Sequence, residues 1–458
     1  MQGIGCTEME IPSFIMMALK RLHISGHQGY VVGGAVRDYC SRRKLIDWDV
    51  ATSAGSEEIK SLFADIRHFS LRPDTVTLVS SDLCCEITVF KGEKGSGRTI
   101  EEDLGHRDFT INAMAYDVAG GVIIDPYGGR RDLSLRLIRA VGDPSERFLE
   151  DPVRLLRAVR LATEFAYKIE TNTQQTVSVM AERLNSVAEE RIRDELLKIL
   201  VSPRPSRGFH LMRNTGLLMH VIPELLEGYR KKQDATHRFT IYKHIMETMD
   251  HVDPDPILRL TALFHDIGKP RVRRKVKGVF RFLGHEKVSA DMSKEIMARL
   301  KFSKKMISRV TNLVNLHMAA VGYHEGWRDN ALRRLIRRVG SEDMDHFLLF
   351  RRADILAHGQ DDGVMAAFLA LKKRLEDLRN RPVAVKERDL ALDGRRVMDV
   401  LGLPQGPEVG KILGQLLETV IDHPELNTEE RLEALLQEMM KKNFQVSALN
   451  RAPMAEVK

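Results

Sequence analysis

The chain has 458 residues, of which 43% are hydrophobic and 29% are charged, so it is long enough for roughly two to four domains of ordinary soluble composition. Its net charge of +7 favours a polyanionic partner without identifying one. The four cysteines lack zinc-site spacing, which argues against a disulfide framework and for a reducing cytoplasm. Because no signal segment and no long apolar run is evident, we expect no membrane partner.

The first informative pattern is a short apolar run that ends in two glycines. The run from Gly29 to Val32 predicts a buried strand, and Gly33 and Gly34 follow it directly. Glycines at a strand end allow backbone N–H groups to approach an anionic ligand, and Arg37 adds a permanent cation close by. The pattern therefore predicts a phosphate-binding turn.

An aspartate pair lies shortly after this turn. Residues 46–50 read as a second strand, in which Asp47 and Asp49 share one face and Trp48 the other. Two adjacent carboxylates repel each other unless a cation lies between them, and Mg²⁺ suits oxygen ligands and substrate phosphates. Together the two patterns indicate phosphoryl or nucleotidyl transfer. The alternative is a simple glycine turn followed by two solvated aspartates.

A hairpin is predicted next, with strands at residues 75–79 and 85–90. The two-residue period places Glu86 on one face with Thr88 and Phe90, which makes Glu86 a candidate third carboxylate beside the aspartate pair. The pattern alone fits a rim glutamate on a polar sheet face equally well.

Two further stretches follow GGAVRD and DWD along the chain: HRDFTINAMAYD at residues 106–117 and IDPYGG at residues 124–129. The four motifs occur in the order found in a known family. The chain resembles the bacterial class II nucleotidyltransferases, which include the tRNA CCA-adding enzymes and the bacterial poly(A) polymerases. The resemblance implies a polymerase-β-like head in which the aspartate pair binds two metal ions, and in which Gly34, Arg37 and Arg107 contact the incoming nucleotide. His106 departs from the pattern, because the family usually has a second arginine there.

A helix with a row of charged residues is predicted over residues 150–160. Asp151, Arg154, Arg157 and Arg160 recur every three residues, and the arginines read as lacking acidic partners four residues further on. An ordered Asp–Arg pair could present donors and acceptors as a base edge does. The resemblance implies that Asp151 and Arg154 select CTP or ATP while Arg157 and Arg160 help to hold the nucleotide. It also implies that the block at residues 190–196 braces this helix.

The middle of the chain carries scattered histidines and aspartates on predicted helices, with the motif HDIGKP at residues 265–270. Imidazole with carboxylate suits borderline and transition metals, and a metal-bound water becomes a nucleophile near neutral pH. The ordered set resembles the HD phosphohydrolase superfamily, which implies a site for Mn²⁺, Ni²⁺ or Mg²⁺ that either hydrolyses a phosphoester or persists as a scaffold. The expected ligands are His244, His265, Asp266, His285, His317 and Asp354.

An amphipathic helix is predicted over residues 331–339, with four apolar residues on its inner face. Its outer face carries arginines with no acid among them, which favours contacts with RNA phosphates. These candidates are Arg333, Arg334, Arg337 and Arg338.

With the resemblance, the chain is expected to be an α+β protein: a small mixed-sheet head, an all-α neck, an HD-type helical body and a helical tail. The expected boundaries are 1–132, 133–202, 203–380 and 381–458. Helices are predicted at residues 411–421 and from a capping box at residues 427–430. The tail resembles the part of CCA-adding enzymes that holds the tRNA elbow.

The favoured function is addition of CMP, and of AMP in the fuller version, from CTP and ATP to the tRNA 3′ end with Mg²⁺. A poly(A) polymerase, and a phosphohydrolase or RNA-binding scaffold with a non-catalytic head, are the alternatives. The connection from Lys91 to Glu102 is short and rich in glycine and charge. By resemblance this favours an enzyme that adds only CC and leaves the adenosine to a separate A-adding enzyme.

Overall fold

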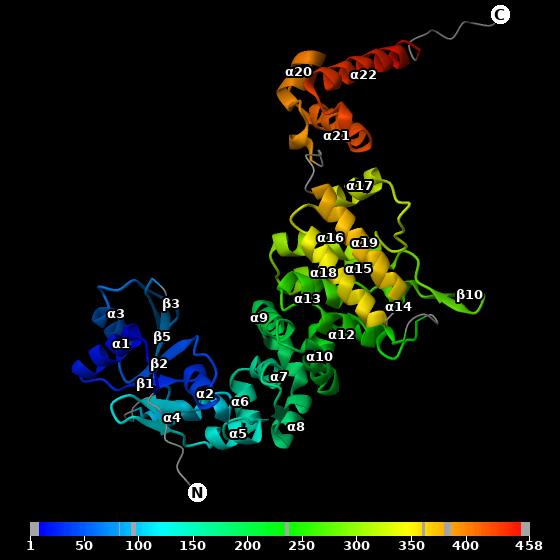
Figure 1. The fold of residues 1–458 in the computed structure, drawn as a ribbon. Helices are drawn as coiled ribbons and strands as arrows, with labels where there is room; N and C mark the ends of the chain where they lie inside the picture. The colour runs from blue at the N-terminus through cyan, green and yellow to red at the C-terminus, as the bar shows by residue number, and fades with distance from the viewer. Residues whose placement is uncertain are drawn as a thin grey trace, which may run out of the picture. The chain divides into compact units, whose positions relative to one another are not determined.

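The computed structural model describes residues 9–81, 83–92, 98–233, 238–359, 362–379 and 386–449, and Figure 1 shows its helices and strands. By their internal contacts the residues form two compact units. The first is Met1–Glu227 with Arg299–Phe302, and the second is Gly228–Ala298 with Ser303–Lys458. Within the described residues, no helix has both the length and the apolar character needed to cross a bilayer.

The first unit begins with a mixed seven-stranded sheet in the order β3-β4-β5-β2-β1-β6-β7. The β2–β5 pair is parallel and the other neighbours are antiparallel. The strands are β1 Gly29–Val32, β2 Trp48–Thr52, β3 His68–Arg72, β4 Thr75–Val79, β5 Cys84–Val89, β6 Ala115–Asp117 and β7 Val122–Ile124. The helices of this part are α1 Ser13–Ile24, α2 Gly34–Cys40, α3 Ser56–Leu62, α4 Ile100–Gly105 and α5 Gly129–Leu135.

The register of the three central strands brings distant residues together. Val32, the last residue of β1, lies opposite Asp49 in β2, and Asp49 lies beside Glu86 in β5. The predicted strand at residues 46–50 begins two residues later, since the ladder of β2 starts only at Trp48 opposite Cys85. Asp47 therefore lies just before the strand, although Trp48 is buried as the alternation predicts.

The next part of the first unit is helical and surrounds α7. Its helices are α6 Pro144–Glu150, α7 Arg154–Glu164, α8 Thr171–Val179, α9 Glu189–Leu200, α10 Pro205–Asn214 and α11 Leu217–Val221, with short strands β8 Leu137–Ile138 and β9 Lys168–Ile169. Leu155, Ala158 and Ala162 of α7, and Phe165 directly after it, are buried.

The single helix predicted over residues 150–160 is wrong, because two helices meet there. Helix α6 ends at Glu150, and α7 begins only at Arg154. Asp151 between them is extended, with φ −151° and ψ 95°. A residue before proline is excluded from the helical region by the proline ring, and Pro152 follows. Asp151 therefore lies in the connection rather than inside a helix.

Residues 299–302 complete the first unit from far along the chain. Leu300 and Phe302 are buried. The carbonyl oxygen of Lys301 accepts a hydrogen bond of 2.6 Å from Arg193, and Arg299 pairs with Glu224 at 2.9 Å.

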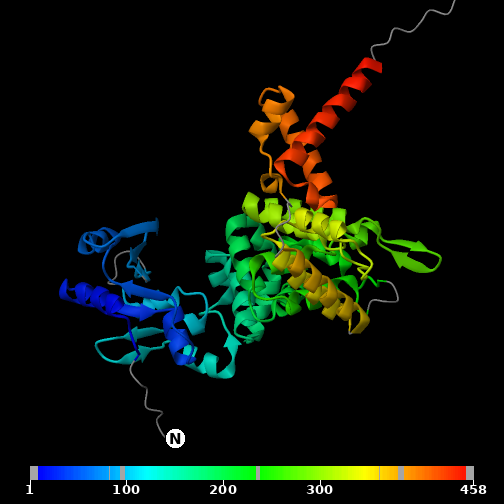
Figure 2. The same ribbon diagram turned by 45° about the horizontal axis from the view of Figure 1, so that its top comes forward.

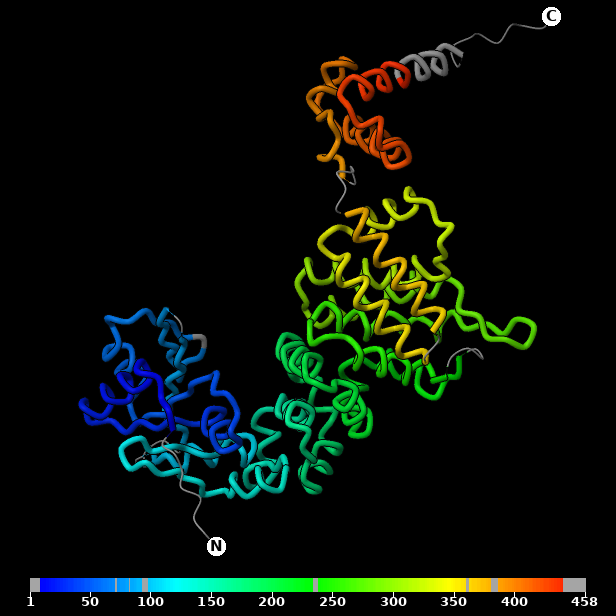
Figure 3. The backbone as a smooth tube through the Cα atoms, in the orientation of Figure 1, coloured from blue at the N-terminus to red at the C-terminus, as the bar shows by residue number. Residues whose placement is uncertain are grey.

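The second unit is almost entirely helical, and Figure 3 follows its chain from α12 onward. Its helices are α12 Ile241–His251, α13 Pro256–Phe264, α14 Lys269–Val272, α15 His285–Arg299, α16 Lys304–Leu316, α17 Asp329–Val339, α18 Met344–His358 and α19 Asp362–Arg379. A two-stranded hairpin, β10 Arg274–Val276 and β11 Val279–Arg281, interrupts them. Helix α12 begins at Ile241, where the side chain of Thr240 caps it.

Three helices form the last part of the second unit: α20 Gly394–Leu401, α21 Pro407–Asp422 and α22 Glu429–Leu449. They share one apolar core that includes Val397, Leu416, Val420 and Leu432. The last helix is capped by Thr428, whose hydroxyl accepts from the N–H of Arg431, and not by the predicted Asn427. The side chain of Asn427 instead bonds to the backbone of Asp389 and Ala391.

Candidate active sites

The glycine-lined end of β1 forms one side of the first candidate site. Gly33 has φ +68°, a conformation that favours glycine. A Cβ atom there would lie 3.0 Å from Nη1 of Arg107 and 3.3 Å from Oδ2 of Asp49. Gly33 therefore keeps the backbone open beside a cation and a carboxylate. Gly34, the next predicted residue, starts α2.

The carboxylates of Asp47, Asp49 and Glu86 lie near one another at this strand end, as the sequence predicts. Burial raises the pKa of Asp49 to about 6, and the negative charges of Glu86 and Asp47 add to that effect against the opposing charge of Arg107. A cation bound beside Asp49 would stabilise the ionised form of its carboxyl group. The donor set, two carboxylates from the adjacent strands β2 and β5 and one from the residue before β2, fits a hard divalent metal ion.

The two predicted phosphate-binding arginines are held in place by acidic residues. Arg37 makes paired bonds of 2.9 and 3.0 Å to Asp38 and one of 2.8 Å to the side-chain oxygen of Asn112. Arg107 bonds to Asp103, which is four residues earlier, at 3.1 Å. Such contacts fix the orientation of each guanidinium group before a ligand binds.

The arginines of α7 have acidic partners, contrary to the sequence expectation. Arg160 pairs with Glu164, four residues on, at 3.3 Å, and with Glu195 of α9 at 2.7 Å. Arg157 lies between Glu195 at 3.3 Å and Asp108 at 2.9 Å. The expected bracing of this helix by the block at residues 190–196 is confirmed, and buried Glu195 is the residue that provides it.

Asp108 connects the head to α7. It accepts hydrogen bonds from Arg157 and from Asn112, which in turn accepts from Arg37. Burial alone would raise the pKa of Asp108, but the charge and hydrogen bond of Arg157 hold that pKa at about 2. Sequence reasoning did not single out Asp108 or Asn112, although both lie within the HRDFTINAMAYD stretch.

Asp151 and Arg154 are near each other but are not paired in this structure. Buried Arg154 bonds to Glu150 and to the carbonyl oxygen of His106, each at 2.9 Å. Asp151 instead pairs with Arg191 of α9 at 2.7 Å. The expected Asp–Arg pair therefore has a different arginine, because the break at Pro152 turns Asp151 toward α9.

A second candidate site lies in the second unit and contains every metal ligand that the sequence predicts there. His244 comes from α12, His265 and Asp266 follow α13, His285 begins α15, His317 follows α16, and Asp354 lies on α18. All six side chains are buried. Among the described residues, the sets of three ligand atoms within 4.8 Å of one another all belong to this site.

The hydrogen bonds of the imidazole rings indicate a metal site. Backbone carbonyl oxygens lie 2.6 to 2.9 Å from Nδ1 of His265, His285 and His317. In a neutral imidazole whose Nδ1–H donates to a carbonyl oxygen, Nε2 is unprotonated and carries a lone pair. The Nε2 atoms of His285 and His317 are 3.1 Å apart, and those of His244 and His265 are equally close. Facing lone pairs repel each other unless a cation lies between them, so these residues fit a bound metal ion.

Three residues that the sequence did not single out support this cluster. His358, one turn after Asp354 on α18, joins His244 and Asp354 as a candidate ligand. Arg351 pairs with Asp354 at 2.8 Å, and Lys269 pairs with Asp266 at 2.7 Å. The four-residue spacing from Asp354 to His358 is a signal that could have found His358.

The expectation that the arginine face of α17 has no acidic partner is wrong. Arg334 pairs with Asp422 at 2.7 Å, Arg337 pairs with Glu418, and Arg333 donates to the carbonyl oxygen of Ile421 at 3.0 Å. All three partners belong to α21, at the helix end where cations are favoured. Arg338, the fourth, is exposed. The inner face is buried as predicted, with Leu332, Leu335, Ile336 and Val339.

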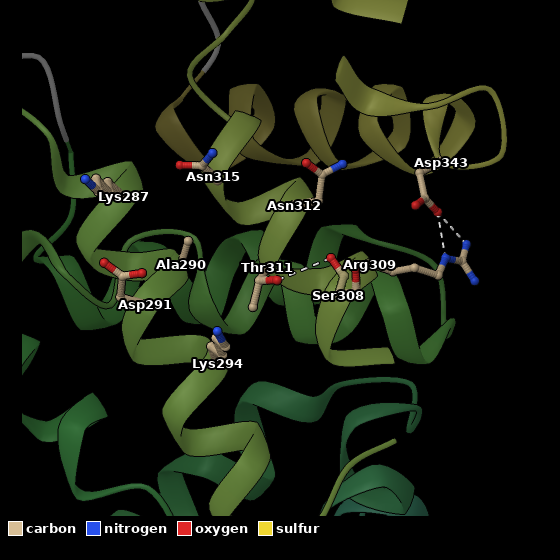
Figure 4. Close-up of a pocket in the computed structure, with 10 residues that line it drawn as sticks. All are labelled: Lys287, Ala290, Asp291, Lys294, Ser308, Arg309, Thr311, Asn312, Asn315 and Asp343. Atoms are coloured by element: carbon tan, nitrogen blue, oxygen red, sulfur yellow. Dashed lines mark hydrogen bonds and ion pairs between the residues drawn. The ribbon is translucent and has the colours of Figure 1, made fainter. Parts of the chain in front are cut away.

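The second unit also has a shallow polar pocket of about 560 Å³ between α15 and α16 (Figure 4). Lys287, Asp291 and Lys294 line it from α15, and Ser308, Thr311 and Asn312 from α16. Arg309 at its edge pairs with Asp343 (Figure 4). No sequence-predicted site residue lines this pocket.

Three domain families match the chain. The "Poly A polymerase head domain" matches residues 29–139, the "Probable RNA and SrmB- binding site of polymerase A" matches residues 166–228, and the "HD domain" matches residues 235–346. The head and HD families are metal-dependent, and the histidine–aspartate cluster of the second unit contains candidate ligands for an ion.

Relatives with three different names are about equally similar to the chain. An A-adding tRNA nucleotidyltransferase of Deinococcus radiodurans is 32% identical over 85% of this chain and 90% of the relative. A CC-adding tRNA nucleotidyltransferase of Thermus thermophilus is 32% identical over 89% and 92%. A CCA-adding enzyme of Lactobacillus johnsonii is 30% identical over 92% and 96%.

A solved structure agrees with these relatives. The CCA-adding enzyme of Bacillus stearothermophilus, solved with CTP, has a TM-score of 0.70 and 26% identity, and the match covers 95% of this chain and all of that one.

Proposed function

Because the chain belongs to the tRNA nucleotidyltransferase family, we propose that it transfers nucleotides from CTP or ATP to the 3′ end of tRNA. In this reaction the terminal 3′ hydroxyl of the RNA attacks the α-phosphorus of the nucleotide, a phosphodiester bond forms, and pyrophosphate leaves. The observation that carries the proposal is the juxtaposition of Asp47, Asp49, Glu86 and Arg107 at the glycine-lined end of β1.

Asp47 and Asp49 are proposed to hold Mg²⁺, with Glu86 as the third carboxylate. When bound, the metal would stabilise negative charge on the phosphate oxygens and favour the deprotonated 3′ hydroxyl. Gly33 and Gly34 give the triphosphate access to the backbone, and Arg37 and Arg107 supply fixed positive charge. The bonds of Arg37 to Asp38 and Asn112 keep that charge aimed before the nucleotide arrives.

Asp151 and Arg154 are proposed to select the base, and Arg157 and Arg160 to support the nucleotide through α7. Arg154 is buried and bonded to Glu150. Only those guanidinium N–H groups that Glu150 does not bind can therefore donate to a base. The carboxylate of Asp151 is paired with Arg191, so a base that uses both of its oxygens would displace that arginine. Selection would then accompany a change of partner at Asp151.

The test uses tRNA that lacks its 3′ CCA, with labelled CTP, ATP, UTP and GTP supplied singly and in pairs. The proposal predicts incorporation from CTP or ATP and from neither of the others. An oligo(A) primer in a parallel reaction identifies a poly(A) polymerase. If no nucleotide is added to either RNA, the head is not catalytic.

The same assay determines how far the enzyme extends its substrate. Residues 93–97 of the Lys91–Glu102 connection lie outside the described residues. Addition of CC alone is therefore inferred only from the sequence of this short connection. We favour CC addition, completed by a separate A-adding enzyme. A full CCA end at an early time point contradicts it, and addition only to tRNA ending in CC identifies an A-adding enzyme.

A second function, phosphoester hydrolysis at the histidine–aspartate cluster, is favoured by the inward lone pairs of its imidazoles. The cluster is proposed to hold Mn²⁺, Ni²⁺ or Mg²⁺, which would supply an activated water. The test is metal-stimulated hydrolysis of a cyclic nucleotide and of a phosphomonoester. Absence of hydrolysis with each ion supports a scaffold role instead.

Contact with the RNA is proposed to involve the α17 region and the tail helices. Of the four predicted arginines, Arg338 is exposed, whereas the other three bind α21. Among the described residues, Cys84 and Cys85 are not in disulfide bonds, which agrees with a reducing compartment, and we propose the cytoplasm.

A further inference from the structure

The hairpin β10–β11 is the most strongly charged stretch of the chain that no site above uses. From Pro270 to Gly284 the sequence has six lysines and arginines and no aspartate or glutamate. Figures 1 and 2 show the hairpin extending away from the helices of the second unit. Its residues Arg274, Lys275, Lys277 and Arg281 are exposed. A projecting basic ribbon of this kind requires an explanation.

The local geometry explains how the hairpin forms. Val276 lies opposite Val279, so Lys277 and Gly278 make a two-residue turn. Both have positive φ, +49° and +83°, as a type I′ turn requires. Arg273 lies 3.5 Å from the centre of the Phe280 ring and anchors the ribbon at its base. The tip of the ribbon is therefore a lysine and a glycine.

The arrangement of charge is unfavourable for the isolated protein. Arg274 lies directly opposite Arg281, on one face of the ribbon. Like charges directly opposite each other on neighbouring strands destabilise a hairpin. Among the described residues, no carboxylate forms an ion pair with Arg274, Lys275, Lys277 or Arg281. The repulsion is relieved when an anion binds across the pair, as successive phosphates of a nucleic acid do.

We propose that the β10–β11 hairpin binds the sugar–phosphate backbone of the RNA substrate, with Arg274 and Arg281 on neighbouring phosphates and Lys277 at the tip. The identity of the RNA as tRNA rests on the proposed function. Phosphate contact requires charge but no base reading, which fits a ribbon whose exposed polar groups are all cations.

A membrane surface is the competing partner for a basic hairpin with exposed valines. A hairpin that enters a bilayer interface carries apolar or aromatic residues at its tip. Here the tip is Lys277–Gly278, while Phe280 is partly covered by Arg273. Val276 and Val279 are 51% and 41% exposed, but they are flanked by the arginine pair and do not form the tip. The charge pattern therefore favours RNA.

The test compares the full-length R274Q/R281Q variant with wild type in binding to tRNA lacking CCA, over a series of salt concentrations. Loss of two phosphate contacts should reduce the slope of log affinity against log salt by about 1.5 and weaken binding about tenfold at low salt. The matched control K304Q/K305Q removes the same charge from exposed residues at the start of α16 and should leave the slope close to wild type. Equal slopes for R274Q/R281Q and wild type overturn the proposal.

Further measurements separate this inference from its alternatives. The V276T/V279T variant should bind tRNA as wild type does, and loss of binding would indicate an apolar contact instead. Binding of wild type, but not R274Q/R281Q, to phosphatidylcholine–phosphatidylserine vesicles, with tRNA affinity unchanged, would assign the hairpin to membranes. Thermal unfolding of R274Q/R281Q should be unchanged or slightly later, since a repulsive pair is removed.

Nucleotide addition distinguishes a failure of the hairpin proposal from a failure of the proposed function. R274Q/R281Q should raise the KM for tRNA and leave kcat at saturating tRNA unchanged. If wild type binds tRNA but adds no nucleotide, the proposed function fails while the salt dependence still decides the role of the hairpin.

Discussion

Each candidate metal site contains a central aspartate, and the pKa values of these two aspartates shift in opposite directions. At the head, burial and then the nearby carboxylates raise the pKa of Asp49 to about 6. In the histidine–aspartate cluster, burial would raise the pKa of Asp266, but His265 and Lys269 hold it well below its usual range. The difference lies in the balance of charges: at Asp49 the charges of Arg107 and Arg37 do not offset burial and the two neighbouring carboxylates, whereas at Asp266 the positive neighbours outweigh burial.

Exposure shows the same contrast. Asp47, just before β2, and Glu86, within β5, are exposed, whereas all six predicted ligands of the cluster are buried and most are bonded to backbone or to each other. A buried charged network must be satisfied when the chain folds, because an unpaired buried charge is costly. The exposed carboxylates of the head carry no such requirement. Folding thus pairs the aspartates of the cluster, whereas those of the head are left to be neutralised by its ligands.

The largest expected effect follows replacement of Asp49, the half-buried carboxylate of the head site. Asp49→Ala should reduce the rate of nucleotide addition by about 1,000-fold or more, the scale of losing a metal ligand. Without divalent ions its free energy of unfolding should equal or slightly exceed that of wild type, because a repelling carboxylate is removed. Single-turnover incorporation and denaturant unfolding measure the two. Asp65→Ala, at an exposed ion pair, is the control, and turnover above about a tenth of wild type rejects the role of Asp49.

In the histidine–aspartate cluster, replacement of an aspartate should have the opposite effect, lowering stability while leaving nucleotide addition unchanged. Asp266→Ala leaves Lys269 buried without its carboxylate and should lower the free energy of unfolding by about 3–5 kcal/mol. Nucleotide addition per folded molecule should stay near wild type. Adding Lys269→Met to the same variant should restore part of the stability, since the unpaired charge is then gone. A fully stable Asp266→Ala protein would contradict the view that folding completes this site.

Asp108→Asn tests the buried connection between the head and α7. The pKa of Asp108 falls from 3.8 to about 2 when the chain folds. Its ionised carboxylate therefore stabilises the fold at pH values above 3.8, and this stabilisation is lost as the pH falls toward 2. The variant should therefore be less stable by about 2 kcal/mol at pH 6 and by about half as much at pH 3. Urea unfolding at both values measures it. A difference that does not change with pH would assign the effect to packing.

The smallest effect concerns base selection. Asp151→Ala should reduce discrimination of CTP against UTP by about 1–2 kcal/mol, or about tenfold, the scale of one base-edge contact. Arg191→Ala breaks the same ion pair but keeps the carboxylate, so it should retain selectivity. If both variants discriminate as wild type does, Asp151 does not read the base.

Local patterns were enough to predict much of the fold. Strand β1 and the β4–β5 hairpin follow from β-branched alternation and turn residues, and the six cluster ligands follow from motif order. Polar partners distant in sequence could not be predicted: Asp108 and Arg157 are 49 residues apart, and Arg334 and Asp422 are 88 apart. An isolated arginine reads as available for phosphate, and only tertiary structure reveals the carboxylate beside it. The break at Pro152 was visible locally, and the helical period was given too much weight against it.

The position of residues 299–302 has a consequence for the order of events on the ribosome. These residues pack with the first unit, yet residues 228–298 precede them in the chain. During synthesis the first unit therefore lacks buried Leu300 and Phe302, and the bond from Arg193 to Lys301, until that intervening segment has been translated. A nascent chain released after Glu227 should be cleaved by protease more readily in α9 than one released after Phe302, so that the head-containing unit matures only once part of its successor exists.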